Sequence, residues 1–271
     1  MDKGTKDEGP LRGTKDQGPR TNEIVSSFIL HPLSFFRPPS FVLRLSSFFS
    51  RRPVRILDPQ PAYALWADSY PPLAHNPLML AEQAALETRL APLTPTNVLD
   101  LGTGSGRWLP FLERTGAKCV GLDFSLPMLK QNPASSPLVC ADAASLPFPN
   151  DSFDLILASL MAGHLRDLAG WVAEVRRVLR RGGHLLYSDF HPLGAAAGWQ
   201  RTFKTATGES FAVRHYPRSI AYQRAALVGV GFKIQAVLEP GLEGQTSSAV
   251  EAFRQRWGER PVVAVFHAVK R

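Results

Sequence analysis

The residues best placed to do chemistry are one acid and three glycines within a short segment. Asp100 lies at the end of an apolar run of the kind that forms buried parallel strands, and Gly102, Gly104 and Gly106 follow at alternate positions. Glycines at this spacing let the backbone turn tightly and approach a ligand closely. The helix expected after them would direct its free N–H groups and positive end at the same ligand. The segment predicts a nucleotide-type site.

Two further acids follow the next two predicted strands. Asp123 ends a strand predicted over 118–122, about twenty residues after the first glycine, where an acid can accept both ribose hydroxyls. Asp142 and Ala143 follow a strand predicted over 137–140, and a carboxylate there can accept the amino group of an adenine. The sequence thus predicts three acids along one sheet edge.

The spacing of the glycines separates two nucleotide classes. A dinucleotide fingerprint requires a glycine three residues after the second one, but this chain has Arg107 there. An NAD-dependent oxidoreductase would also have no use for Asp142. Both observations disfavour that class.

The glycine pattern after Asp100 resembles motif I of the class I S-adenosylmethionine-dependent methyltransferases, which implies that Asp100 helps to hold the cofactor's amino group. Residues 146–158 are similar to the LPF-x-D-x-SFD signature of the subfamily that contains quinone and biotin-pathway enzymes. The resemblance covers residues 60–190 well. It implies S-adenosylmethionine as cofactor, bound by Asp100, Gly102, Gly104, Gly106, Asp123, Asp142, Ala143 and Tyr70.

A helix predicted over 61–90 carries Tyr63, Trp66 and Tyr70 at helical spacing. The resemblance implies that this segment folds over the cofactor as a lid, where the Tyr70 ring would cover the sulfonium by cation–π contact. Ordinary helix packing is the alternative for all three rings, and it is favoured for Trp66.

Two histidines are candidate general bases. His164 and His191 follow the fourth and fifth predicted strands, at the edge where an open α/β sheet exposes its crevice. A hydroxyl or acidic carbon acceptor needs such a base near neutral pH, whereas a carboxylate needs none. A capping or packing role is the alternative for both rings.

Acceptor specificity is predicted to lie in an inserted hairpin over 199–216. Arg201 and Arg214 within it would bind an acidic acceptor or a phosphate-bearing carrier. The alternative is that these charges form the solvated face of the hairpin.

The remaining segments complete a Rossmann-like α/β fold with a seven-stranded, mostly parallel sheet and helices on both faces. A helix is predicted over 168–179, ended by Gly182 and Gly183, and later elements alternate as helix, strand, helix and strand. The resemblance implies that the last strand runs antiparallel to its neighbours. Residues 56–271 are predicted to form the methyltransferase domain.

Residues 1–55 differ from the rest in composition. Residues 4–10 recur almost unchanged at 13–19, and Ser-Phe units with prolines follow, so the segment is expected to be a disordered tail. A translation start near Val54 is the alternative. The tail holds ten Lys and Arg against five acids, which accounts for most of the chain's net charge of +8.

Composition limits the partners. The weakly basic remainder does not predict nucleic-acid binding, no apolar run is long enough to span a membrane, and no metal is required. We expect a cytoplasmic methyltransferase acting on a small-molecule or carrier-bound acceptor. A non-catalytic cofactor-binding subunit or sensor is the alternative, and the oligomeric state stays open.

Overall fold

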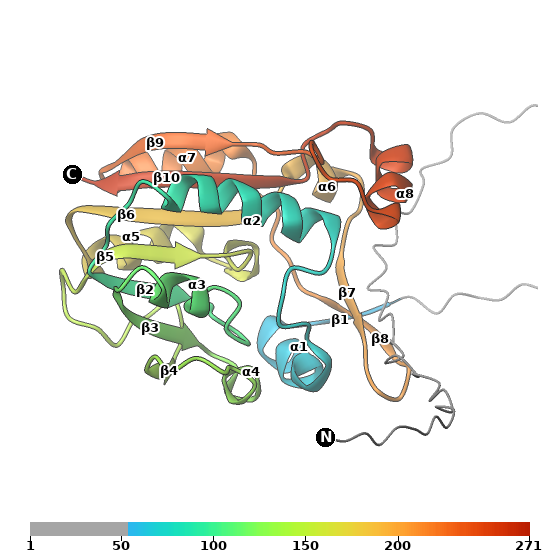
Figure 1. The fold of residues 1–271 in the computed structure, drawn as a ribbon, viewed down its shortest axis with the longest axis horizontal. Coiled ribbons are helices and arrows are strands. Elements are labelled where there is room, and N and C mark those ends of the chain that lie inside the picture. The colour runs from blue at the N-terminus through green and yellow to red at the C-terminus, as the bar shows by residue number, and fades with distance from the viewer. Residues whose placement is uncertain (1–53) are drawn as a thin grey trace, which may run out of the picture.

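The computed structural model describes residues 54–271, so nearly all of the predicted tail, its repeat included, lies outside the described residues. The described chain contains a seven-stranded sheet in the order β4-β3-β2-β5-β6-β10-β9 (Figure 1). These strands are β2 (Asn97–Leu101), β3 (Lys118–Asp123), β4 (Leu138–Cys140), β5 (Phe153–Ala158), β6 (Leu179–Phe190), β9 (Phe232–Leu238) and β10 (Val263–Lys270). The first five are parallel, and β10 is antiparallel to both β6 and β9, which confirms the predicted fold class.

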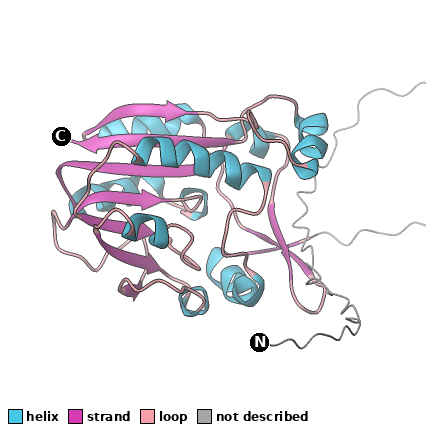
Figure 2. Ribbon diagram, viewed as in Figure 1, coloured by secondary structure: helices cyan, strands magenta, loops and turns pink. Residues whose placement is uncertain are grey.

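Helices cover both faces of this sheet (Figure 2). One face packs against α2 (Pro77–Leu90), α3 (Leu109–Glu113) and α8 (Ser248–Trp257), and the other against α5 (Leu168–Val178) and α7 (Ile220–Gly229). Shorter helices are α4 (Leu126–Lys130) and α6 (Pro192–Ala196), with single 3-10 turns at η1 (Ala67–Ser69) and η2 (Ala162–His164). Each face of the seven-stranded sheet therefore has its own apolar core.

Helix α5 shows how the sequence sets this packing. The Asp167 side chain accepts a hydrogen bond from the backbone N–H of Gly170 and so caps the first turn. Apolar residues then recur at intervals of three and four and bury one stripe, which includes Trp171 and Val175. The helix ends at Val178, earlier than the predicted stop at the glycines, because Leu179 already pairs with β5.

The predicted lid helix over 61–90 is two helices instead of one. Helix α1 (Pro59–Trp66) is followed by η1 and a loop, and α2 begins only at Pro77. Tyr70 adopts an extended backbone because Pro71 follows it, and the residue before a proline disfavours helical geometry. The Asn76 side chain then accepts a hydrogen bond from Met79 N and starts α2.

A second, smaller sheet lies beside α1, in the order β1-β8-β7 (Figure 1). Strands β7 (Arg201–Lys204) and β8 (Ser210–Val213) form the predicted hairpin, and β1 (Arg55–Leu57) adds to it in parallel with β8. Trp66 stacks on Phe203 with ring centroids 4.9 Å apart, which joins α1 to this sheet. Helix α1 and the small sheet lie across from the carboxyl ends of β2 and β5.

Candidate active site

A cavity of about 410 Å³ lies where the carboxyl ends of β2, β3 and β5 face α1 and the hairpin. Its walls include Tyr63 and Arg201, and of the predicted site residues they include Asp100, Gly102, Gly104, Asp123, Asp142, Ala143, Tyr70 and His164. The structure thus brings together eight of the ten predicted site residues. Gly106 and His191 do not line this cavity.

The glycine loop forms one wall. Gly102, Gly104 and Gly106 have φ angles of +76°, +54° and +85°, in the left-handed region that favours glycine. A Cβ atom at Gly106 would also overlap the side chain of Asn132. Gly106 therefore shapes the loop from behind, while Gly102 and Gly104 face the cavity.

Asp100 is a buried acid, only 2% exposed. Its Oδ2 accepts a hydrogen bond of 2.7 Å from the Thr103 hydroxyl, and within residues 54–271 it forms no ion pair. Burial raises the pKa of Asp100 to about 7, although Thr103 and Arg107 oppose this shift. A buried carboxylate of this kind gains stability from a cationic ligand group.

Asp123 lies at the end of β3 with both oxygens facing backbone donors. It accepts hydrogen bonds from Gly104 N at 2.9 Å and from Ser125 N at 2.8 Å, one on each oxygen. Burial raises the pKa of Asp123 to about 6, against the effect of these bonds. The backbone N–H of Phe124 also acts on this carboxylate, which has about four acceptor positions, so acceptor capacity remains for a ligand hydroxyl.

The third acid follows β4. Asp142 Oδ1 accepts a hydrogen bond of 2.8 Å from Ala144 N, which fixes the turn after the strand. Ala143 is buried beside it, and both residues line the cavity. The acids after β2, β3 and β4 consequently share one wall, in the order of the strands.

A buried ion pair connects the glycine loop to α2. Arg107 Nη2 lies 2.7 Å from Oε2 of Glu82, whose side chain is fully buried. Ser159 and Ser188 donate to the other oxygen of Glu82 at 2.6 and 2.7 Å. Arg107 Nη1 is buried without a hydrogen-bond partner among the described residues. The Arg107 side chain is also part of the cavity wall, which gives this wall a positive charge beside the glycine loop.

A histidine, a tyrosine and an arginine are linked by hydrogen bonds at the other end of the cavity. His164 Nδ1 lies 2.8 Å from the carbonyl oxygen of Arg214 and must donate to it, so Nε2 is free to accept from the Tyr63 hydroxyl at 3.0 Å. Arg201 Nη1 donates to the same hydroxyl at 2.6 Å. Burial, followed by the charge of Arg201, lowers the pKa of His164 well below its ordinary value, so the ring is neutral.

His191 has a different environment. Its Nε2 lies 2.7 Å from Glu239 Oε2, and its Nδ1 accepts from Leu193 N and caps α6. Both ring nitrogens are occupied away from the cavity. Of the two histidines predicted as bases, the structure places only His164 at the cavity.

Sequence reasoning missed three of these features. The signal for the buried Glu82 is that it is the one acid in the mostly apolar first ten residues of α2. In the sequence, Arg107 indicates only a departure from the dinucleotide pattern. Tyr63 was recognised as an aromatic lid residue, but its hydrogen bonds link elements far apart in the chain, and no local pattern indicates them.

The fold and the site define a nucleotide-type α/β binding protein with one acid after each of three adjacent strands. Residues 99–187 match the model of a family described as a methyltransferase domain. The chain is 32% identical to a malonyl-[acyl-carrier protein] O-methyltransferase of Pseudescherichia vulneris over 208 residues, which are 76% of this chain and 72% of the relative. The chain belongs to the S-adenosylmethionine-dependent methyltransferases.

Other relatives match over shorter segments. A demethylmenaquinone methyltransferase of Corynebacterium urealyticum is 38% identical over 94 residues, 34% of this chain and 41% of the relative. The chain spans less than half the length of the demethylmenaquinone methyltransferases that it matches. A solved S-adenosylmethionine-dependent methyltransferase from Mesorhizobium loti superposes with a TM-score of 0.56 at 26% identity, covering 70% of this chain and 98% of that one.

Two further properties concern the described part of the chain. No helix within residues 54–271 has the length and apolar character needed to cross a membrane. The same residues contain no group of three or more His, Cys, Asp or Glu side chains arranged to hold a metal ion.

Proposed function

We propose that the protein transfers a methyl group from S-adenosylmethionine to a small-molecule or carrier-bound acceptor in the 410 Å³ cavity. One observation carries this proposal: three acids, a glycine loop and the Arg107 side chain line one space. S-adenosylmethionine has a matching set of groups, namely an ammonium, a carboxylate, a ribose diol and an adenine. The residues present fit this cofactor.

Each residue receives a proposed role from its surroundings. Asp100 would hold the ammonium group, and Arg107 Nη1 the carboxylate. Asp123 would accept from the ribose hydroxyls through its remaining acceptor capacity, and Asp142 with Ala143 would contact the adenine. These roles place the methyl-bearing end of the cofactor toward Tyr63, Tyr70 and His164.

When bound, S-adenosylmethionine supplies a methyl group already activated by its sulfonium, so the chain mainly has to position the acceptor and exclude water. Tyr63, Trp66 and Tyr70 form an aromatic roof, with the Trp66 and Tyr70 rings 4.8 Å apart. In this proposal His164 accepts a hydrogen bond from the Tyr63 hydroxyl and so orients it. His191 has no part in this proposal.

The relatives' names include both kinds of acceptor, a quinone in demethylmenaquinone methyltransferase and a carrier-bound acid in malonyl-[acyl-carrier protein] O-methyltransferase. We infer that residues 56–271 form the catalytic domain and that the hairpin selects the acceptor. We place the reaction in the cytoplasm, where thiols such as those of Cys119 and Cys140, both free in the structure, stay reduced.

Calorimetry on the full chain tests the cofactor assignment. We expect S-adenosylmethionine and S-adenosylhomocysteine to bind and NAD not to bind. Asp123→Ala should weaken binding of the first two by about 1–3 kcal/mol, because a hydrogen-bonding carboxylate is lost. Binding of NAD alone would overturn the proposal. Transfer of tritiated methyl to an added acceptor would distinguish an enzyme from a binding subunit, which should show none.

A further inference from the structure

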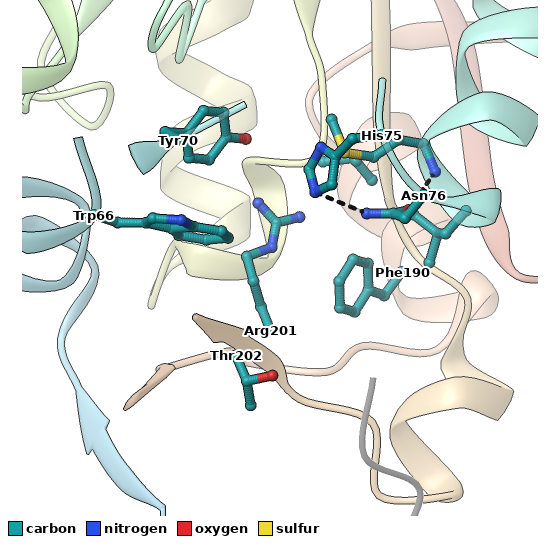
Figure 3. Close-up of a pocket in the computed structure, with 10 residues that line it drawn as sticks. Trp66, Tyr70, His75, Asn76, Phe190, Arg201 and Thr202 are labelled. Carbon is teal, nitrogen blue, oxygen red and sulfur yellow. Dashed lines mark hydrogen bonds between the residues drawn. The ribbon is translucent and has the colours of Figure 1, made fainter. Parts of the chain in front are cut away.

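The cavity has an annex beside Arg201. A space of about 30 Å³ adjoins the main cavity and shares Tyr70, Met79, Leu160 and Arg201 with its walls. Figure 3 shows the Arg201 side chain projecting into the middle of this space, between Tyr70 and Phe190. The guanidinium carbon lies 5.0 Å from the centre of the Phe190 ring.

Within residues 54–271, no acid forms an ion pair with Arg201. Among residues 54–271 its one hydrogen-bond partner is the neutral Tyr63 hydroxyl, and it forms no ion pair. Asp189, whose charge also acts on Arg201, is hydrogen-bonded to His215 at 2.9 Å. Two other arginines near the site do have an acidic partner: Arg107 pairs with Glu82, and Arg214 pairs with Asp58 at the surface.

The two ends of the combined cavity differ in charge. Asp100, Asp123 and Asp142 line the end beside the glycine loop, whereas none of the described residues that line the annex is an acid. The two histidines nearest to Arg201 add no positive charge, because burial lowers the pKa of both His75 and His164. One guanidinium is thus the cation of the annex.

We propose that Arg201 binds a carboxylate of the methyl acceptor, so that the acceptor is an organic acid held with its charged end toward the annex. This inference rests on the proposed methyltransferase function. A guanidinium presents paired N–H donors that match a planar carboxylate, and in apolar surroundings such a bond is strong. Asn76 Nδ2, which donates to His75 Nε2 at 3.4 Å, offers a further N–H in the annex.

A phosphate fits this place less well. Phosphate sites combine more than one cation or several backbone N–H groups at a helix or loop. The annex instead offers one guanidinium among the apolar or aromatic side chains of Trp66, Tyr70, Leu160 and Phe190. The surroundings favour a single negative charge on a small planar group.

Binding of matched probes to the full chain, saturated with S-adenosylhomocysteine, tests the proposal. The probes are benzoate and hexanoate, each with its uncharged amide, and phenyl phosphate, followed by quenching of tryptophan fluorescence because Trp66 lines the annex. We expect each acid to bind at least about tenfold more tightly than its amide. Equal binding of acid and amide, no saturable binding of either acid, or tighter binding of phenyl phosphate than of benzoate would overturn it.

Variants assign the selectivity to one side chain. Arg201→Gln should weaken acid binding by about 10- to 100-fold and leave amide binding unchanged, because a charge-assisted hydrogen bond is lost. Lys204→Gln removes the same charge from an exposed site on the same strand and should have no effect. Unchanged acid binding by Arg201→Gln refutes the proposal. If that variant does not fold, Arg201→Lys and the wild-type acid-to-amide ratio still decide.

Measuring S-adenosylhomocysteine affinity distinguishes failure of the proposed methyltransferase function from failure of the role proposed for Arg201. If the wild-type protein does not bind S-adenosylhomocysteine, the proposed function fails. If it binds S-adenosylhomocysteine but does not prefer acids, only the role of Arg201 fails.

Discussion

Replacement of Glu82 by glutamine tests the buried ion pair beneath the glycine loop. Glu82 is fully buried and accepts hydrogen bonds from Arg107, Ser159 and Ser188. Glutamine keeps the shape and can still accept from Arg107 while its NH2 donates to the serine hydroxyls. It leaves the guanidinium without a counter-charge, however, and breaking a buried pair in this way costs about 3–5 kcal/mol. We expect a loss near the lower limit, about 3 kcal/mol.

Urea unfolding of the full chain, followed by tryptophan fluorescence, measures this loss. A decrease of about 3 kcal/mol corresponds to a melting temperature about 6–12 °C lower for a domain of this size. Glu87→Gln on the same helix, where the side chain is partly exposed, should change stability by less than about 0.5 kcal/mol.

The double variant Glu82→Gln/Arg107→Gln separates charge from packing. Each single variant leaves one buried charge without its partner, whereas the double variant leaves none. Removing both charges should therefore be less destabilising than the sum of the single changes. A loss below about 1 kcal/mol for Glu82→Gln, or strictly additive losses, would refute the view that the charge of Glu82 compensates Arg107.

Three further predictions follow from the site and the sheet. Because the pKa of Asp100 is about 7 and its ionised form would hold the ammonium, S-adenosylhomocysteine affinity should fall up to about tenfold per pH unit below 7. Calorimetry from pH 5.5 to 8 measures this, and an affinity that does not change with pH would contradict the prediction. Burial lowers the pKa of His267 in the folded state to about 4, below its unfolded value. The stability that the neutral ring contributes is therefore complete above pH 6.5 and is lost as pH falls, by about 2 kcal/mol at pH 5. If the urea midpoint of His267→Gln depends on pH as strongly as that of the wild-type protein, His267 is not the origin of the pH dependence. Gly106→Ala should reduce both stability and cofactor affinity because its Cβ overlaps Asn132, whereas Gly208→Ala, at a φ of +83° with open space around it, should leave cofactor affinity unchanged in the same calorimetric assay.

Local patterns were sufficient to predict the main sheet. Strands β2, β3 and β5 are short apolar runs that end at acids or turns, and such runs are buried wherever a parallel sheet is covered on both faces. The three acids share one edge because parallel strands place their carboxyl ends together. Chain order and strand direction, both readable in sequence, decide this part of the site.

The parts that sequence could not predict depend on contacts between distant segments. His191 does follow β6, as predicted, but the side chains of a strand alternate between faces, and Glu239 and the start of α6 determine where this ring points. Helical spacing extended the predicted lid past Tyr70, although Pro71 breaks it there. Strand β1 is too short to recognise without its partner β8.

The pairing of β1 with β8 has a consequence for the timing of ligand exchange. Strand β1 runs into α1 through Asp58, which bonds to Arg214 Nε at 2.6 Å, and Leu57 O accepts from Arg214 N at 2.8 Å. The helix above the donor side and the hairpin above the acceptor side are thereby fastened into a single piece. Under the proposed function, in which α1 covers the methyl donor and the hairpin covers the acceptor, a movement that opens one side would also open the other, and the two products would leave together.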